Sequence, residues 1–176
     1  MSLNRSSGIN KQLSKAAGES LVVYKLSRRG WLVVNANSGV QNMPNFDLIA
    51  MKEDRRITVQ VKAAKSGNQV PMAGIYREDG RYYNNKDGPK ADVVAMVRLD
   101  PKGEDDDVFI VPTEEANDIA REYGDAHAIE KKKRGSSLNF PMWARVKGTS
   151  KSPDTKRAME RLAVYKVNDD LETEVM

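Results

Sequence analysis

The 176-residue chain contains no cysteine and only one histidine, His127. Without cysteine the chain has no disulfides, no thiolate zinc sites and no cysteine nucleophile. We expect the single histidine on a surface loop rather than in a catalytic centre. Chemistry in this protein must therefore depend on carboxylates, amides, hydroxyls and amines.

Long apolar runs are also missing. No stretch approaches the roughly 18 residues that a membrane-spanning helix needs, and no apolar segment near the start indicates a secretory signal. Hydrophobic residues make up 39% of the chain and charged residues 31%. This balance is typical of one soluble core with a well-hydrated surface. We expect no membrane partner and a cytoplasmic location.

The formal net charge is +4, which is compatible with binding to nucleic acid. Basic residues are clustered, and the segment around Tyr82 also contains tyrosines that could stack on bases. The candidate nucleic-acid contacts are Arg55, Arg56, Arg77, Arg81, Lys131, Lys132, Lys133 and Arg134. Taken singly, each basic run is more typical of a solvated loop, whereas for the tyrosine-containing segment both interpretations stay open.

Hydrophobic periodicity and turn residues predict a disordered tail over 1–8, one domain over 9–167 and an acidic tail over 168–176. The predicted helices are 9–29, 113–123 and 153–167, and the predicted strands are 31–34, 46–51, 56–64, 91–97 and 108–111. Residues 66–90 contain four glycines and are expected to form an irregular or hairpin-like insertion. Residues 125–151 are expected to be a loop with a short strand around Trp143. The order of these elements predicts an α/β fold, with a mixed central β-sheet flanked by helices.

Two strands bring polar side chains to one place. In strand 56–64, Gln60 and Lys62 alternate with the apolar Val59 and Val61 and so share the opposite face. Asp47 interrupts the apolar strand before it. A short turn at 52–55 makes these two strands neighbours, so we expect Asp47 close to Gln60 and Lys62.

Glu19 is an unusual residue in the first helix. The apolar face of this helix is predicted from Leu13, Ala16, Ala17, Leu21, Val23 and Tyr24. At about 100° per residue, Glu19 lies at the edge of that face. A carboxylate at that position is partly desolvated and needs a cation or hydrogen-bond donors to compensate its charge.

Together these residues form an oxygen-rich cation site. The carboxylates of Glu19 and Asp47, the amide oxygen of Gln60 and waters match the octahedral preference of Mg²⁺, with Mn²⁺ as a substitute. A metal there would activate a water and offset charge on a phosphate, and Lys62 would orient or deprotonate the nucleophile. The predicted chemistry is metal-assisted hydrolysis of a phosphodiester.

At this point the sequence resembles the PD-(D/E)XK nuclease superfamily, which has the restriction-endonuclease-like fold. The resemblance covers residues 12–65 well and 91–123 more loosely. It is carried by Gly18-Glu19, Gly30-Trp31-Leu32-Val33-Val34, Asn45-Phe46-Asp47-Leu48-Ile49-Ala50 and Val59-Gln60-Val61-Lys62-Ala63-Ala64.

The resemblance implies that Glu19 and Asp47 hold metal and that Lys62 serves catalysis. Asn45 and Phe46 precede the aspartate where the family pattern has proline. Gln60 replaces the usual acid, as in some homing-endonuclease and restriction-type members. The chain is thus similar to a glutamine variant of the family, acting on double-stranded DNA. Cutting both strands would imply a homodimer with one site per strand.

Two other functions stay open for the same residues. The chain could be a nuclease-fold module that binds DNA but has lost cleavage, since Gln60 removes one charge from the metal site. It could also be a protein-interaction domain whose basic loops are only solvating. Salt-dependent DNA binding separates the nuclease and the DNA-binding module from the protein-interaction domain. Metal-dependent cutting separates the nuclease from the DNA-binding module.

Overall fold

The computed structural model describes residues 3–36, 46–65, 69–78, 81–84, 91–133, 140–148 and 152–168. The elements in chain order are α1 (Leu3–Ser27), β1 (Leu32–Asn35), β2 (Leu48–Lys52), β3 (Arg55–Lys65), β4 (Gln69–Glu78), β5 (Arg81–Asn84), β6 (Val93–Leu99), β7 (Asp107–Pro112), α2 (Thr113–Lys133), β8 (Phe140–Arg145) and α3 (Pro153–Ala163).

The central sheet has five strands in the order β1-β2-β3-β6-β7. The pairs β1–β2, β2–β3 and β6–β7 are antiparallel, and β3 and β6 are parallel. A smaller sheet has the order β5-β4-β8. The predicted α/β fold with a mixed central sheet flanked by helices is confirmed.

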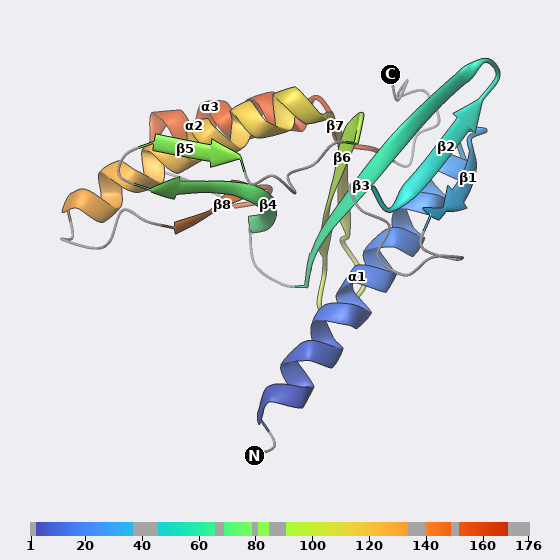
Figure 1. Ribbon diagram of the computed structural model, residues 1–176, viewed down its shortest axis with the longest axis horizontal. Helices are drawn as coiled ribbons and strands as arrows, with labels where there is room; N and C mark the ends of the chain where they lie inside the picture. The colour runs from blue at the N-terminus through green and yellow to red at the C-terminus, as the bar shows by residue number, and fades with distance from the viewer. Residues whose placement is uncertain are drawn as a thin grey trace.

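The central sheet has an apolar core on each face. On one face α1 packs through Val22 and Leu26 against Leu48, Val59 and neighbouring strand residues. On the other face α2, α3 and the smaller sheet surround a second cluster that includes Met96. Figure 1 shows α1 on one side of the central sheet and the two later helices together on the other.

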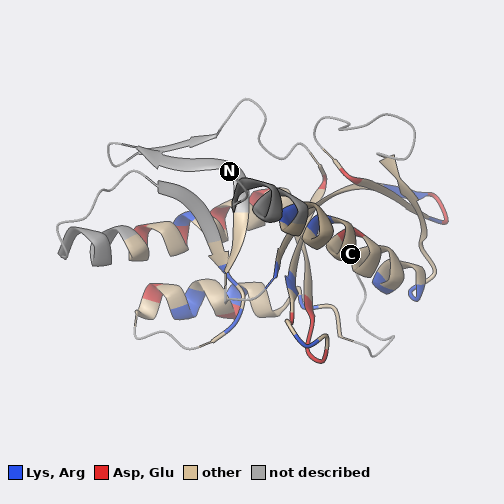
Figure 2. Cartoon of the chain, turned by 90° about the horizontal axis from the view of Figure 1, so that it is seen from below, with Lys and Arg blue, Asp and Glu red and all other residues tan. Residues whose placement is uncertain are grey.

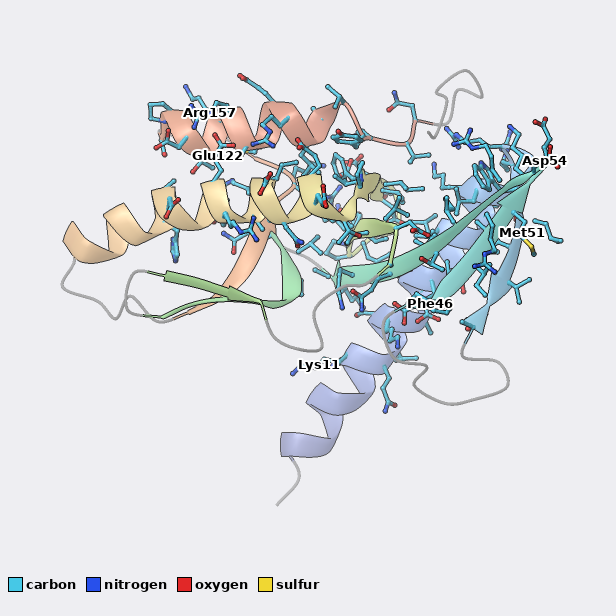
Figure 3. All side chains as sticks on the ribbon, turned by 45° about the horizontal axis from the view of Figure 1, so that its top comes forward. Lys11, Phe46, Met51, Asp54, Glu122 and Arg157 are labelled. Atoms are coloured by element: carbon cyan, nitrogen blue, oxygen red, sulfur yellow. The ribbon has the colours of Figure 1, made fainter. Side chains whose placement is uncertain are left out.

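Helices α2 and α3 are joined by ion pairs. Arg161 donates to Glu115 at 2.8 Å through Nη2 and to Glu122 at 2.9 Å through Nη1. Arg157 also donates to Glu122, and Figure 3 shows these two side chains facing each other between the helices. This layer is therefore fixed by charge as well as by apolar packing.

The helix boundaries differ from the predicted ones. Residues 3–8, predicted as a disordered tail, belong to α1, since each residue added to an existing helix gains a backbone hydrogen bond. Helix α2 was predicted to end near Tyr123 but continues to Lys133. His127 therefore lies on a helix, stacked on Tyr123 with ring centroids 6.2 Å apart, and not on a loop. Residues 169–176 of the predicted acidic tail lie outside the described residues.

The buried face of α1 also differs. Leu13 and Tyr24, both predicted on the apolar face, are 62% and 50% exposed, while Val22 and Leu26 are fully buried. The N-terminal half of α1 extends past the end of the sheet, as Figure 1 shows. Leu13 lies in that half, and its apolar side chain is therefore not buried.

The predicted insertion at 66–90 contains β4 and β5, which pair as an antiparallel hairpin. The short strand expected around Trp143 is β8, which joins β4 in the smaller sheet. No helix in the described part of the chain is both long and apolar enough to cross a membrane.

Candidate active site

Gly18 sets how closely α1 approaches β3. A Cβ atom built on Gly18 would lie 2.5 Å from the Cβ of Ala63 and 3.6 Å from Cγ1 of Val61. Any larger residue would force the helix away from the strand. The glycine of the Gly18-Glu19 pair thus brings the next residue, Glu19, down to the level of the sheet.

Asp47 lies where β3 extends beyond the start of β2. The β2–β3 pairing ends at Leu48 and Val59, so the β3 backbone beyond Val59 has no β2 partner. The Asp47 backbone N–H donates to the Val59 carbonyl at 2.8 Å, and the Val61 N–H donates to Asp47 Oδ2 at 2.8 Å. The Asp47 side chain therefore replaces the missing ladder partner, which fixes its orientation. The residue is only 8% exposed.

Glu19 reaches the same place from α1 and is 9% exposed. Asn35 at the end of β1 donates to Glu19 Oε2 at 3.1 Å. The other oxygen, Oε1, is buried and accepts no hydrogen bond from the described residues. The predicted partial desolvation of this carboxylate is confirmed.

Lys15 connects the two carboxylates and was not among the predicted site residues. Its Nζ lies 3.1 Å from Asp47 Oδ1 and 3.6 Å from Glu19 Oε1. Burial lowers the pKa of Lys15, but hydrogen bonds and attraction to Asp47 and Glu19 outweigh this effect and raise it above 10.5. The spacing of four residues between Lys15 and Glu19 was the available signal, because such pairs are neighbours on one helix face.

Gln60 and Lys62 lie on β3 opposite Val94 and Met96 of β6. The Gln60 Oε1 atom is buried and has no hydrogen-bond partner among the described residues. Burial lowers the pKa of the Lys62 ammonium, the Asp47 carboxylate opposes that shift, and the Lys15 charge adds to it. Lys62 is therefore close enough to Asp47 and Lys15 for their charges to affect its protonation.

The carboxylates of Glu19 and Asp47 come together at Lys15, whereas Gln60 extends from the face of β3 shared with Val94 and Met96, away from the face that packs on α1. No group of three or more histidine, cysteine, aspartate or glutamate residues with metal-binding geometry occurs in the described ranges. However, Glu19 Oε1 and Gln60 Oε1 are buried oxygens with acceptor capacity, and a hard cation prefers oxygen ligands. The neighbouring carboxylates of Glu19 and Asp47 are donors of the chemical type that Mg²⁺ or Mn²⁺ prefers.

The candidate nucleic-acid contacts fall on three parts of the molecule. Arg55 and Arg56 are exposed at the tip of the β2–β3 hairpin, where the Arg55 guanidinium lies 5.5 Å from the centroid of the buried Trp31 ring. Figure 2 shows this charged tip far from α2 and α3. Arg77 and Arg81 belong to β4 and β5, and residues 131–133 end α2, but their side chains are not described. Arg134 lies outside the described residues.

The comparisons with known proteins give a remote structural likeness. No family model matches the chain, and no curated protein matches it either. Among solved structures, the chain is similar to a bacterial homing endonuclease, I-Ssp6803I, with a TM-score of 0.48 and 14% identity over 88% of this chain and 87% of that one. At this TM-score and identity the likeness carries no argument about function, so the geometry of the site must carry it.

Proposed function

We propose that this protein is a metal-dependent endonuclease that hydrolyses phosphodiester bonds in DNA. One observation carries the proposal: two nearly buried carboxylates, Glu19 and Asp47, meet at Lys15, and the Asp47 charge acts on the partly buried amine of Lys62. Burying such charges costs free energy, and fold stability alone does not require it. Charged groups that converge in this way with so little exposure to solvent are typical of active sites.

Glu19, Asp47 and Gln60 would hold the metal. When bound, Mg²⁺ or Mn²⁺ would supply Lewis-acid activation of a water and stabilise negative charge on the phosphate. The Val61 N–H and the Asn35 amide keep the two carboxylates oriented. These hydrogen bonds would hold the metal ligands in place before a metal binds.

Lys62 would act on the reacting groups. Because burial lowers its pKa, a larger fraction of its amine is neutral at a given pH than for an exposed lysine. A neutral amine can accept a proton from the attacking water, and the protonated form attracts the phosphate. Both roles require Lys62 to lie near Asp47, and the effect of the Asp47 charge on the Lys62 ammonium supports this.

We further propose that the DNA partner is double-stranded and that the protein acts as a homodimer, one site per strand. The hairpin tip with Arg55 and Arg56 lies about 23 Å along β3 from Lys62, at 3.3 Å per residue. That length corresponds to about seven nucleotides of one strand at 3.4 Å each. A duplex lying along β3 would contact both regions.

The test is cleavage of duplex, branched and single-stranded DNA and of RNA, with Mg²⁺, Mn²⁺ or a chelator. We expect metal-dependent cutting of duplex DNA that Lys62→Ala and Asp47→Asn abolish. Lys156→Ala, an exposed lysine on α3, is the matched control and should cut normally. No cutting of any substrate under any metal condition would refute the proposal.

A second function is favoured by the position of Lys15. An ammonium already compensates both carboxylates, and Gln60 adds no charge for a metal, so the domain could bind DNA without cutting it. Salt-dependent duplex binding without metal-dependent cleavage would identify this binding module.

A further inference from the structure

Lys15 lies between the two carboxylates that would bind metal. Its ammonium is within 4 Å of both Asp47 Oδ1 and Glu19 Oε1. The side chains of the two acids are each only 11% exposed, whereas that of Lys15 is 50% exposed. The acids are fixed at the bottom of the site, and the cation reaches them from the solvent side.

We propose that Lys15 is a built-in counter-ion that a divalent cation displaces when it binds the acid pair. Two nearly buried carboxylates destabilise the fold unless a positive charge compensates them. A lysine on a flexible four-carbon chain can provide that charge and then move into water. A metal between the same oxygens would repel the ammonium, so the two cations compete.

The proposal concerns the same site as the proposed function and rests on it only for the identity of the metal ligands. It adds that metal affinity is limited by an internal competitor as well as by the neutral Gln60. It also predicts opposite effects of removing Lys15: the metal-free protein becomes less stable, and metal binding becomes tighter.

The experiment compares wild type with Lys15→Met and Lys11→Met. Methionine keeps the unbranched chain without the charge. Lys11 lies one turn earlier on α1 and is exposed. Figure 3 shows Lys11 apart from Phe46, the residue that precedes Asp47. We expect calorimetry to give about fivefold tighter Mg²⁺ binding for Lys15→Met, the scale of a half-exposed ion pair, and no change for Lys11→Met. In chelator, Lys15→Met should melt about 2–4 °C lower.

A second measurement needs no variant and applies even if Lys15→Met folds poorly. In wild-type protein with ¹³C-labelled lysine, the Lys15 side-chain signals should shift during Mg²⁺ titration, while those of Lys11 stay constant. Binding of Mg²⁺ without any shift at Lys15 would overturn the proposal. An unchanged or weaker Mg²⁺ affinity in folded Lys15→Met would overturn it as well.

These outcomes are distinguishable from failure of the proposed function. Tighter Mg²⁺ binding in Lys15→Met without DNA cutting by any variant would support the counter-ion and refute the nuclease. Normal cutting together with unchanged Mg²⁺ affinity in Lys15→Met would do the reverse.

Discussion

Gly18 offers the most direct test of how the fold positions the site, through the variant Gly18→Ala. The added Cβ would lie 2.5 Å from the Ala63 Cβ, whereas carbon atoms in ordinary contact are about 3.5–4.0 Å apart. Because the Ala63 Cβ is held rigidly by β3, the helix itself must move away by about 1–1.5 Å. Glu19, the next residue, moves with it.

The effects on stability and on function should differ in size. Overpacking costs about 1–3 kcal/mol, and alanine regains about 1 kcal/mol of helix propensity over glycine. The net loss is about 1 kcal/mol, which lowers the melting temperature by about 2–4 °C. A 1 Å displacement of a catalytic group costs about 100-fold in rate. Cleavage should therefore fall far more than stability does.

The assay measures cleavage rate, Mg²⁺ affinity by calorimetry and thermal unfolding for the same preparations. Ser20→Ala, on the exposed side of the same helix, is the control and should behave as wild type. The double variant Gly18→Ala/Ala63→Gly removes the clash and should recover most of the activity and metal affinity. The reasoning is refuted if Gly18→Ala alone retains wild-type cleavage and Mg²⁺ affinity, or if the double variant recovers neither.

Three further predictions follow from the site. Gln60→Glu adds a charged oxygen at the same length and should tighten Mg²⁺ binding in calorimetry, whereas Asp47→Asn should lose metal binding and cleavage; no effect of either would mean that these side chains form no metal site. Lys62→Met should raise the free energy of unfolding by about 1 kcal/mol while abolishing cleavage. Since the folded-state pKa of Lys62 is lowered, the unfolded chain binds more protons between that pKa and 10.5, so wild-type stability gains a contribution as pH rises through this window. In Lys62→Met, the melting temperature should lack the contribution that wild type gains in this pH window. The same pH profile for both proteins would contradict this prediction. Neutralising residues 131–134 should flatten the salt dependence of duplex binding, and an unchanged slope would make this run a solvated surface.

Local patterns in the sequence were enough for much of this protein. The order of helices and strands and the alternation in β3 depend on neighbouring residues, so the α/β class and the shared side of Gln60 and Lys62 could be predicted. The short β2–β3 turn also made Asp47 a predictable neighbour of β3. Glu19 was identifiable because a carboxylate at the edge of an apolar helix face is unusual.

Only the tertiary structure decided which parts of α1 are buried and what compensates the acids. Leu13 looks apolar on the helix yet lies exposed, because burial depends on whether a sheet lies beneath that turn. The clash limit at Gly18 is set by Ala63, which is 45 positions later and unrelated in local pattern. Lys15 belongs to the site because α1 packs beside β3 and its Lys15 Nζ lies 3.1 Å from Asp47 Oδ1. Periodicity fixes directions along one element, but the distances between elements arise only when they pack.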